Sequence, residues 1–158
     1  MYSMDMGCYS PSTGMYPNMG VYQNSELLDL MVEAMKDERS DRVKYKKMMD
    51  MADDKKMRKQ INFAYEDEGK HYKMFQQISY MLTGQMLNIP EPNPPKLGSF
   101  LDAIESSING ELGAVELYRK IRSMLPTTQM RDMLYEIITD EQEHATRFVY
   151  LYSMEKKH

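Results

Sequence analysis

Two stretches of this 158-residue chain decide its fold, and they lie 73 residues apart. Residues 67–75 read DEGKHYKMF, and residues 140–148 read DEQEHATRF. Both contain Glu-x-x-His, with Asp directly before the Glu and Phe four residues after the His. Residues three apart lie on one face of an α-helix, so each stretch places a carboxylate and an imidazole side by side.

Helical periodicity extends outward from both stretches. Apolar residues recur at a spacing typical of amphipathic helices in four segments, and no segment alternates for long enough to be a strand. We expect an all-α protein with helices at about 26–53, 56–83, 99–125 and 127–154. Ser25, Ser99 and Thr127 are the predicted N-caps.

The second half of the chain repeats the first. A shift of 73 residues pairs Glu38 with Glu111, Tyr45 with Tyr118, and each Glu-x-x-His with the other. Such a repeat indicates duplication of a helical hairpin, and two hairpins form a four-helix bundle.

The segment between the two predicted hairpins, residues 84–98, holds four of the seven prolines. It cannot be helical, and an extended polyproline segment of this length reaches roughly 45 Å. A 28-residue helix is about 42 Å long. The linker can therefore return along the whole bundle, which predicts a crossover connection and parallel second and third helices.

Four glutamates and two histidines fall within the apolar faces, at mid-helix. Four buried carboxylates cost several kcal/mol each unless they are compensated. Two divalent cations would balance them, as in di-iron and di-manganese carboxylate bundles. The predicted metal ligands are Glu38, Glu68, His71, Glu111, Glu141 and His144.

Five further residues are candidates for the surroundings of this site. Asp67 and Asp140 lie one turn before the histidines and could orient their free ring nitrogens. Tyr45 and Tyr118 are a second pair of candidates. Arg42 faces the site and could pair with a ligand carboxylate, guard a substrate entrance or form a salt bridge at the surface.

At these residues the sequence resembles the ferritin-like superfamily, and within it the di-iron domain of rubrerythrins, over about residues 26–154. The resemblance implies that Glu68 and Glu141 bridge two metals. Glu38 with His71, and Glu111 with His144, would complete the two coordination spheres. Rubrerythrins use such a centre to reduce hydrogen peroxide, and ferritins use one to oxidise iron(II).

Two departures from the rubrerythrin pattern bear on function. Cys8 is the single cysteine, so the chain cannot form the four-cysteine rubredoxin-like centre that supplies electrons. Where rubrerythrins carry an extra Glu near the third-helix ligand, the neighbouring turns offer Ile108 and Ala114. Any reductant must then come from a separate electron-donor protein.

Three functions stay open at this point. The leading hypothesis is a di-iron site that reacts with hydrogen peroxide or dioxygen. The second is a di-manganese site that disproportionates peroxide, as catalases do, without an external donor. The third is a non-enzymatic metal-binding or coat-type protein, in which the Met-, Tyr- and Gly-rich residues 1–25 carry the function.

The composition of the chain limits the binding partners and the cellular location that we expect. The net charge of -4 and pI near 5.4 do not favour binding to nucleic acid or to an anionic membrane. No apolar run approaches the roughly 20 residues of a membrane span. Without a recognisable signal peptide we expect a cytoplasmic protein, and bundles of this size often form homodimers. Residues 1–25 are expected to be a flexible tail, or else an assembly segment.

Overall fold

The computed structural model describes residues 24–156, and these residues form four α-helices with no strand among them. The helices are α1 (Ser25–Met51), α2 (Lys55–Thr83), α3 (Phe100–Met124) and α4 (Thr128–Glu155). The all-α prediction is confirmed for this part of the chain, and each helix boundary lies within two residues of its predicted position. Almost all of the predicted tail lies outside the described residues.

Polar side chains cap the start of each helix. Ser99 and Thr127 cap α3 and α4 as predicted, and Asp54 caps α2. The prediction for α1 was wrong by one residue. Asn24 is the N-cap, since its side-chain oxygen accepts the backbone N–H three residues on, and Ser25 is the first helical residue.

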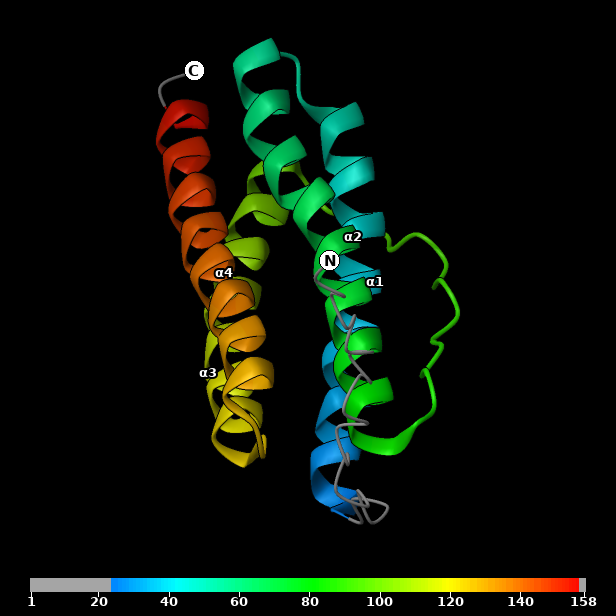
Figure 1. Ribbon diagram of the computed structural model, residues 1–158. Helices are drawn as coiled ribbons and strands as arrows, with labels where there is room; N and C mark the ends of the chain where they lie inside the picture. The colour runs from blue at the N-terminus through cyan, green and yellow to red at the C-terminus, as the bar shows by residue number, and fades with distance from the viewer. Residues whose placement is uncertain (1–23, 157–158) are drawn as a thin grey trace, which may run out of the picture.

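The four helices form a bundle in which neighbours run in opposite directions (Figure 1). α1 packs on α2 and α3 on α4, while α2 also packs on α4 and α1 on α3. The remaining pairs, α1 with α4 and α2 with α3, lie across the diagonals and run parallel. All four helices can therefore direct side chains toward one central axis.

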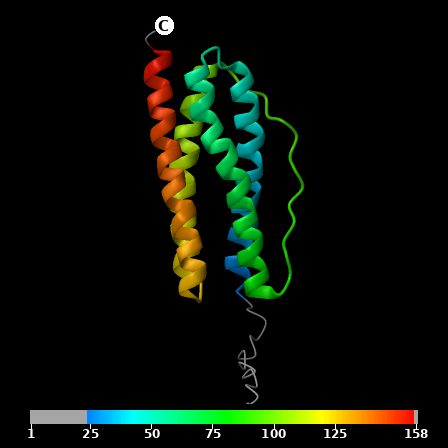
Figure 2. The ribbon, with the colours of Figure 1, turned by 45° about the horizontal axis from the view of Figure 1, so that its top comes forward.

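The long linker runs along the outside of the bundle, from the end of α2 to the start of α3 (Figure 2). Gly84 ends α2 with a φ of 73°, a left-handed conformation that favours glycine. On α2, the Tyr72 hydroxyl donates to the carbonyl of Ile89 and accepts from its N–H, at 3.3 and 2.9 Å. Lys47 of α1 donates to the carbonyl of Pro95 at 2.8 Å. The linker is thus fastened across the α1–α2 face.

The apolar core is divided into two clusters, one toward each end of the bundle. Methionines fill part of both, with Met31 and Met35 in one and Met48 and Met57 in the other. The helix segments between the clusters carry buried carboxylates and imidazoles instead of apolar side chains. Among the described residues, no helix is long and apolar enough to cross a membrane.

Candidate metal centre

All six predicted ligands meet in this polar layer at the middle of the bundle. α1 and α3 contribute one glutamate each, and α2 and α4 contribute one Glu-x-x-His each. Every one of these side chains is at most 2% exposed. They form two groups that could each hold a metal ion, with ligand atoms within 4.8 Å of one another: Glu38, Glu68, His71 and Glu141; and Glu68, Glu111, Glu141 and His144.

Two glutamates belong to both groups. Glu141 reaches the two imidazoles with separate oxygens: Oε1 is 2.9 Å from Nδ1 of His71, and Oε2 is 3.4 Å from Nδ1 of His144. Glu68 Oε1 lies 3.6 Å from Nδ1 of His144. The imidazole ring centres are 5.8 Å apart. Glu68 and Glu141 thus occupy positions from which one carboxylate could contact two ions.

The outward nitrogen of each histidine is held by an aspartate. Nε2 of His71 lies 3.1 Å from Asp140, and Nε2 of His144 lies 3.2 Å from Asp67. An ionised carboxylate only accepts hydrogen bonds, so each Nε2 carries the proton and each Nδ1 can direct its lone pair inward. The pairing crosses between α2 and α4, so each aspartate orients the histidine of the other helix.

Two tyrosines hold the glutamates that belong to one group only. The Tyr118 hydroxyl of α3 donates to Glu38 of α1 at 2.5 Å, and the Tyr45 hydroxyl of α1 donates to Glu111 of α3. Burial, together with the facing carboxylates, raises the pKa of both phenols well above their usual range. Both hydroxyls therefore remain hydrogen-bond donors at neutral pH.

Among the described residues, five buried polar atoms of the cluster have no well-formed hydrogen bond, and their polar neighbours are one another. They are Glu38 Oε2, Glu68 Oε1, Glu141 Oε1, His71 Nδ1 and His144 Nδ1. Unpaired buried polar atoms are rare in proteins because each loses its hydration without replacement. Here they lie on five of the six candidate ligands and face one another. This donor set fits divalent metal ions, which would replace the missing partners.

Without a metal, protons must balance these charges. Burial lowers the pKa of His71, but the surrounding carboxylates of Asp140, Glu141 and Glu38 outweigh it and raise the pKa to about 12. For His144, burial also lowers the pKa, but the carboxylates of Asp67, Glu111 and Glu141 outweigh it and raise the pKa to about 11. Burial also raises the pKa of Glu68 and of Glu111 well above their usual range. A bound metal would therefore displace protons from the site.

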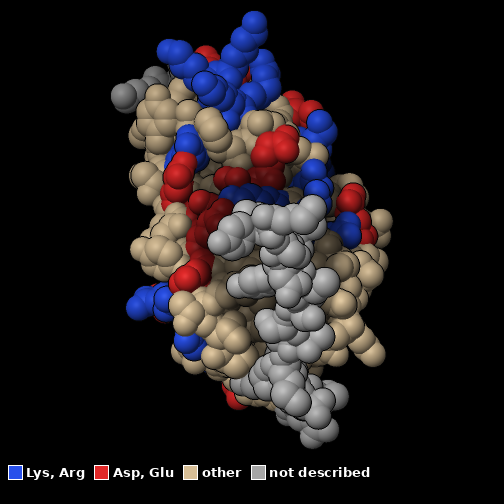
Figure 3. All heavy atoms as spheres, viewed as in Figure 1, with Lys and Arg blue, Asp and Glu red and all other residues tan. Residues whose placement is uncertain are grey.

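Charged groups outside the ligand set lie on two sides of the cluster. Carboxylates gather at mid-height where α2 and α4 meet (Figure 3). There Lys70 lies 2.5 Å from Glu136 and 3.6 Å from Asp140, which in turn holds His71. Nothing in the sequence singled out this lysine, because its contact with Asp140 depends on how α2 packs against α4.

The fifth surrounding residue, Arg42, lies on the α1–α2 side. Its guanidinium is 4.9 Å from the ring centre of Tyr65. Arg42 forms no ion pair with any residue of the described range 24–156. Within the described residues, Arg42 therefore forms neither a surface salt bridge nor an ion pair with a candidate ligand.

Comparison with known proteins gives one distant likeness. The chain is 25% identical over 112 residues to YhjR of Bacillus subtilis (strain 168), described as an uncharacterized protein. The match covers 71% of this chain and 76% of YhjR. No family model matches the chain. No solved structure matches it either. The function must therefore be inferred from the site itself.

Proposed function

We propose that this protein binds two metal ions, most readily iron, and that the metal pair reacts with hydrogen peroxide or dioxygen. The observation that carries the proposal is the set of buried polar atoms, on five of the six clustered side chains, that face one another without a well-formed hydrogen bond. In this assignment Glu68 and Glu141 would contribute to both ions. Glu38 and His71 would help to hold one ion, and Glu111 and His144 would help to hold the other.

The charge balance supports two divalent ions. Four ionised glutamates and two neutral imidazoles carry four negative charges, which two divalent cations cancel. A carboxylate and imidazole donor set suits iron and manganese. When bound, such a pair would supply redox chemistry toward an O–O bond. The residues of this chain would hold the ions, exclude bulk water and keep Tyr45 and Tyr118 as proton-bearing donors beside Glu111 and Glu38.

A ferritin-like bundle made of two duplicated hairpins is the fold we infer for this function. Contacts that recur at the 73-residue offset support the duplication. His71–Asp140 corresponds to His144–Asp67. Phe75 packs on Tyr118 as Phe148 packs on Tyr45, with ring centres 5.3 and 5.0 Å apart. Arg58 and Arg131 donate to the carbonyls of Ala52 and Leu125 in the two short turns.

A di-manganese site that disproportionates peroxide is the second candidate. The observation that favours it is the single cysteine of the chain, Cys8, because peroxide reduction needs electrons and disproportionation does not. With iron, a separate donor protein would have to supply these electrons.

Peroxide consumption by metal-loaded protein separates the candidates. The protein is loaded anaerobically with iron(II) or with manganese(II), and peroxide loss is followed with and without a chemical reductant. Turnover by the iron form that needs the reductant supports the leading proposal. Fast turnover by the manganese form without reductant supports the second. A loaded protein that turns over neither peroxide nor dioxygen, with Glu68→Ala leaving assembly unchanged, supports a structural role.

A further inference from the structure

A pocket opens beside the candidate metal centre on the α1–α2 face. Its volume is about 290 Å³, and Glu38 and Glu68 are among its lining residues. Both glutamates are at most 2% exposed, so they form its inner end. Three cations, Arg39, Arg42 and Lys73, line the rest of the pocket together with Asn88 and Glu91 of the linker and residues of α2. The pocket therefore joins solvent to one side of the metal ligands.

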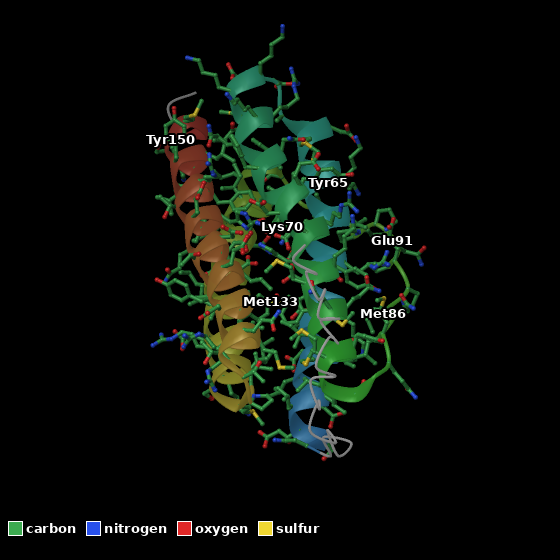
Figure 4. All side chains as sticks on the ribbon, viewed as in Figure 1. Tyr65, Lys70, Met86, Glu91, Met133 and Tyr150 are labelled. Carbon is green, nitrogen blue, oxygen red and sulfur yellow. The ribbon has the colours of Figure 1, made fainter. Side chains whose placement is uncertain are left out.

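The two arginines have hydrogen-bond donors to spare. Within residues 24–156, the Nε atoms of Arg39 and Arg42 are buried and have no hydrogen-bond partner. Each guanidinium stacks on a tyrosine of α2, at 4.2 Å from Tyr72 and 4.9 Å from Tyr65. Arg39 has one ion pair, a 3.5 Å contact with the exposed Glu91, and Arg42 has none within the described chain. Figure 4 shows Tyr65 and Glu91 on the side where the linker runs.

The position of Arg42 depends on a glycine. A Cβ at Gly69 would lie 3.0 Å from Cζ and 3.1 Å from Nε of Arg42. Gly69 stands in the interior of α2, where glycine weakens a helix relative to alanine. Its absent side chain lets the guanidinium lie directly on the helix, next to the ligand Glu68.

The second hairpin lacks these residues at the equivalent positions. At the 73-residue offset, Arg39 corresponds to Leu112, Arg42 to Val115 and Gly69 to Gln142. The two hairpins thus share the candidate metal ligands but differ in the charged groups beside them. The difference points to a one-sided approach to the metal centre.

We propose that this pocket binds a small oxyanion, a carboxylate or a phosphate, next to the metal pair. The inference rests on the proposed function, because bound metals would cancel the charge of Glu38 and Glu68 and leave the three cations dominant. Guanidinium groups with free donors favour carboxylate and phosphate oxygens. The same cations would repel an arriving metal ion. Hydrogen peroxide is uncharged and far smaller than the pocket, so it explains neither the arginines nor the volume.

Arginine Nε–H signals in ¹⁵N-labelled full-length protein test the proposal. The protein is titrated metal-free and loaded with zinc(II), using acetate, phosphate and, as a neutral control, acetamide. We expect acetate or phosphate to shift the Arg39 and Arg42 signals saturably, more tightly with zinc bound. The signal of the exposed Arg119, which pairs with Glu116, should move only with ionic strength. The anion that binds more tightly, acetate or phosphate, identifies the chemical class of the ligand.

Three variants separate the pocket from general surface charge. Arg42→Gln should weaken anion binding at least tenfold. Gly69→Ala keeps every charge but displaces the guanidinium, and it should also weaken binding several-fold. Gly113→Ala is the matched control, because a Cβ there meets no atom of the described residues within 4 Å, and it should leave binding unchanged.

The outcomes distinguish this inference from the proposed function. Zinc uptake without saturable arginine shifts overturns the pocket and leaves the metal centre standing. Absence of zinc uptake contradicts the metal centre, and the metal-free titration then decides the pocket alone. Equal shifts of the Arg39, Arg42 and Arg119 signals would show a general effect of ionic strength. An anion affinity that is unchanged in Gly69→Ala would show that the position of the Arg42 guanidinium does not matter. Either result overturns the inference.

Discussion

Raising the pH should destabilise the metal-free protein. The folded chain holds protons on His71 and His144, whose pKa values are about 12 and about 11. In the unfolded chain both histidines return to an ordinary pKa near 6.5. Their contribution to stability is therefore complete below pH 6.5 and is lost as the pH rises toward 11. The raised pKa values of Glu68 and Glu111 act in the same direction.

The expected loss of stability follows from the number of protons that the two histidines release on unfolding. Two histidines that stay protonated only in the folded state reduce the free energy of unfolding by roughly 3 kcal/mol per pH unit. Between pH 7 and pH 8.5 the metal-free protein should lose about 4 kcal/mol, a large part of the typical 5–15 kcal/mol for a domain. Both histidines are at most 1% exposed, so solvent screening reduces this figure little.

Urea unfolding at a series of pH values, in the presence of a chelator, measures the effect. A zinc-loaded sample should show the opposite slope, since acid protonates the ligands and releases the metal. In the metal-free protein, His71→Gln should reduce the slope by about half. A metal-free stability that is flat or rises between pH 7 and pH 8.5 would refute the charge balance described for the site.

Three other changes test the surroundings of the site and one helix. Asp67→Asn should weaken zinc binding roughly 10- to 100-fold, because it removes the charge that orients His144. A competing chelator dye measures this, and an unchanged affinity would contradict the role of Asp67. Tyr118→Phe should destabilise the metal-free protein by about 1–3 kcal/mol, since Glu38 loses its donor; an unchanged urea midpoint would argue against this hydrogen bond. Gly113→Ala should stabilise the protein by about 0.5–1 kcal/mol, and a lower midpoint would mean that this face of α3 is covered.

The candidate ligands could be predicted from the sequence because local geometry places them. Glu-x-x-His fixes Glu and His on one helix face whatever the rest of the chain does. In each hairpin, the single glutamate and the Glu-x-x-His lie at equal distances from the turn, and the 73-residue repeat makes this distance the same in both hairpins. The sequence therefore predicts that all six side chains lie at one height along the bundle. The helices themselves were predictable for a similar reason, since apolar periodicity is a property of each segment alone.

Contacts between helices could not be predicted in the same way. The bonds from Asp67 to His144 and from Asp140 to His71 depend on α2 lying beside α4. The sequence identified both aspartates but could not assign their partners. Arg39 was missed because its place in the pocket depends on Tyr72 and on a linker that returns along the same face.

The metal content of the purified protein tests the central claim most directly. Elemental analysis after anaerobic loading with iron(II) or manganese(II) should give about two ions per chain in the unaltered protein. Glu38→Ala removes a ligand of one group only and should leave about one ion, whereas Glu68→Ala removes a ligand of both groups and should leave close to none. An unaltered protein that retains no metal after loading would contradict the account.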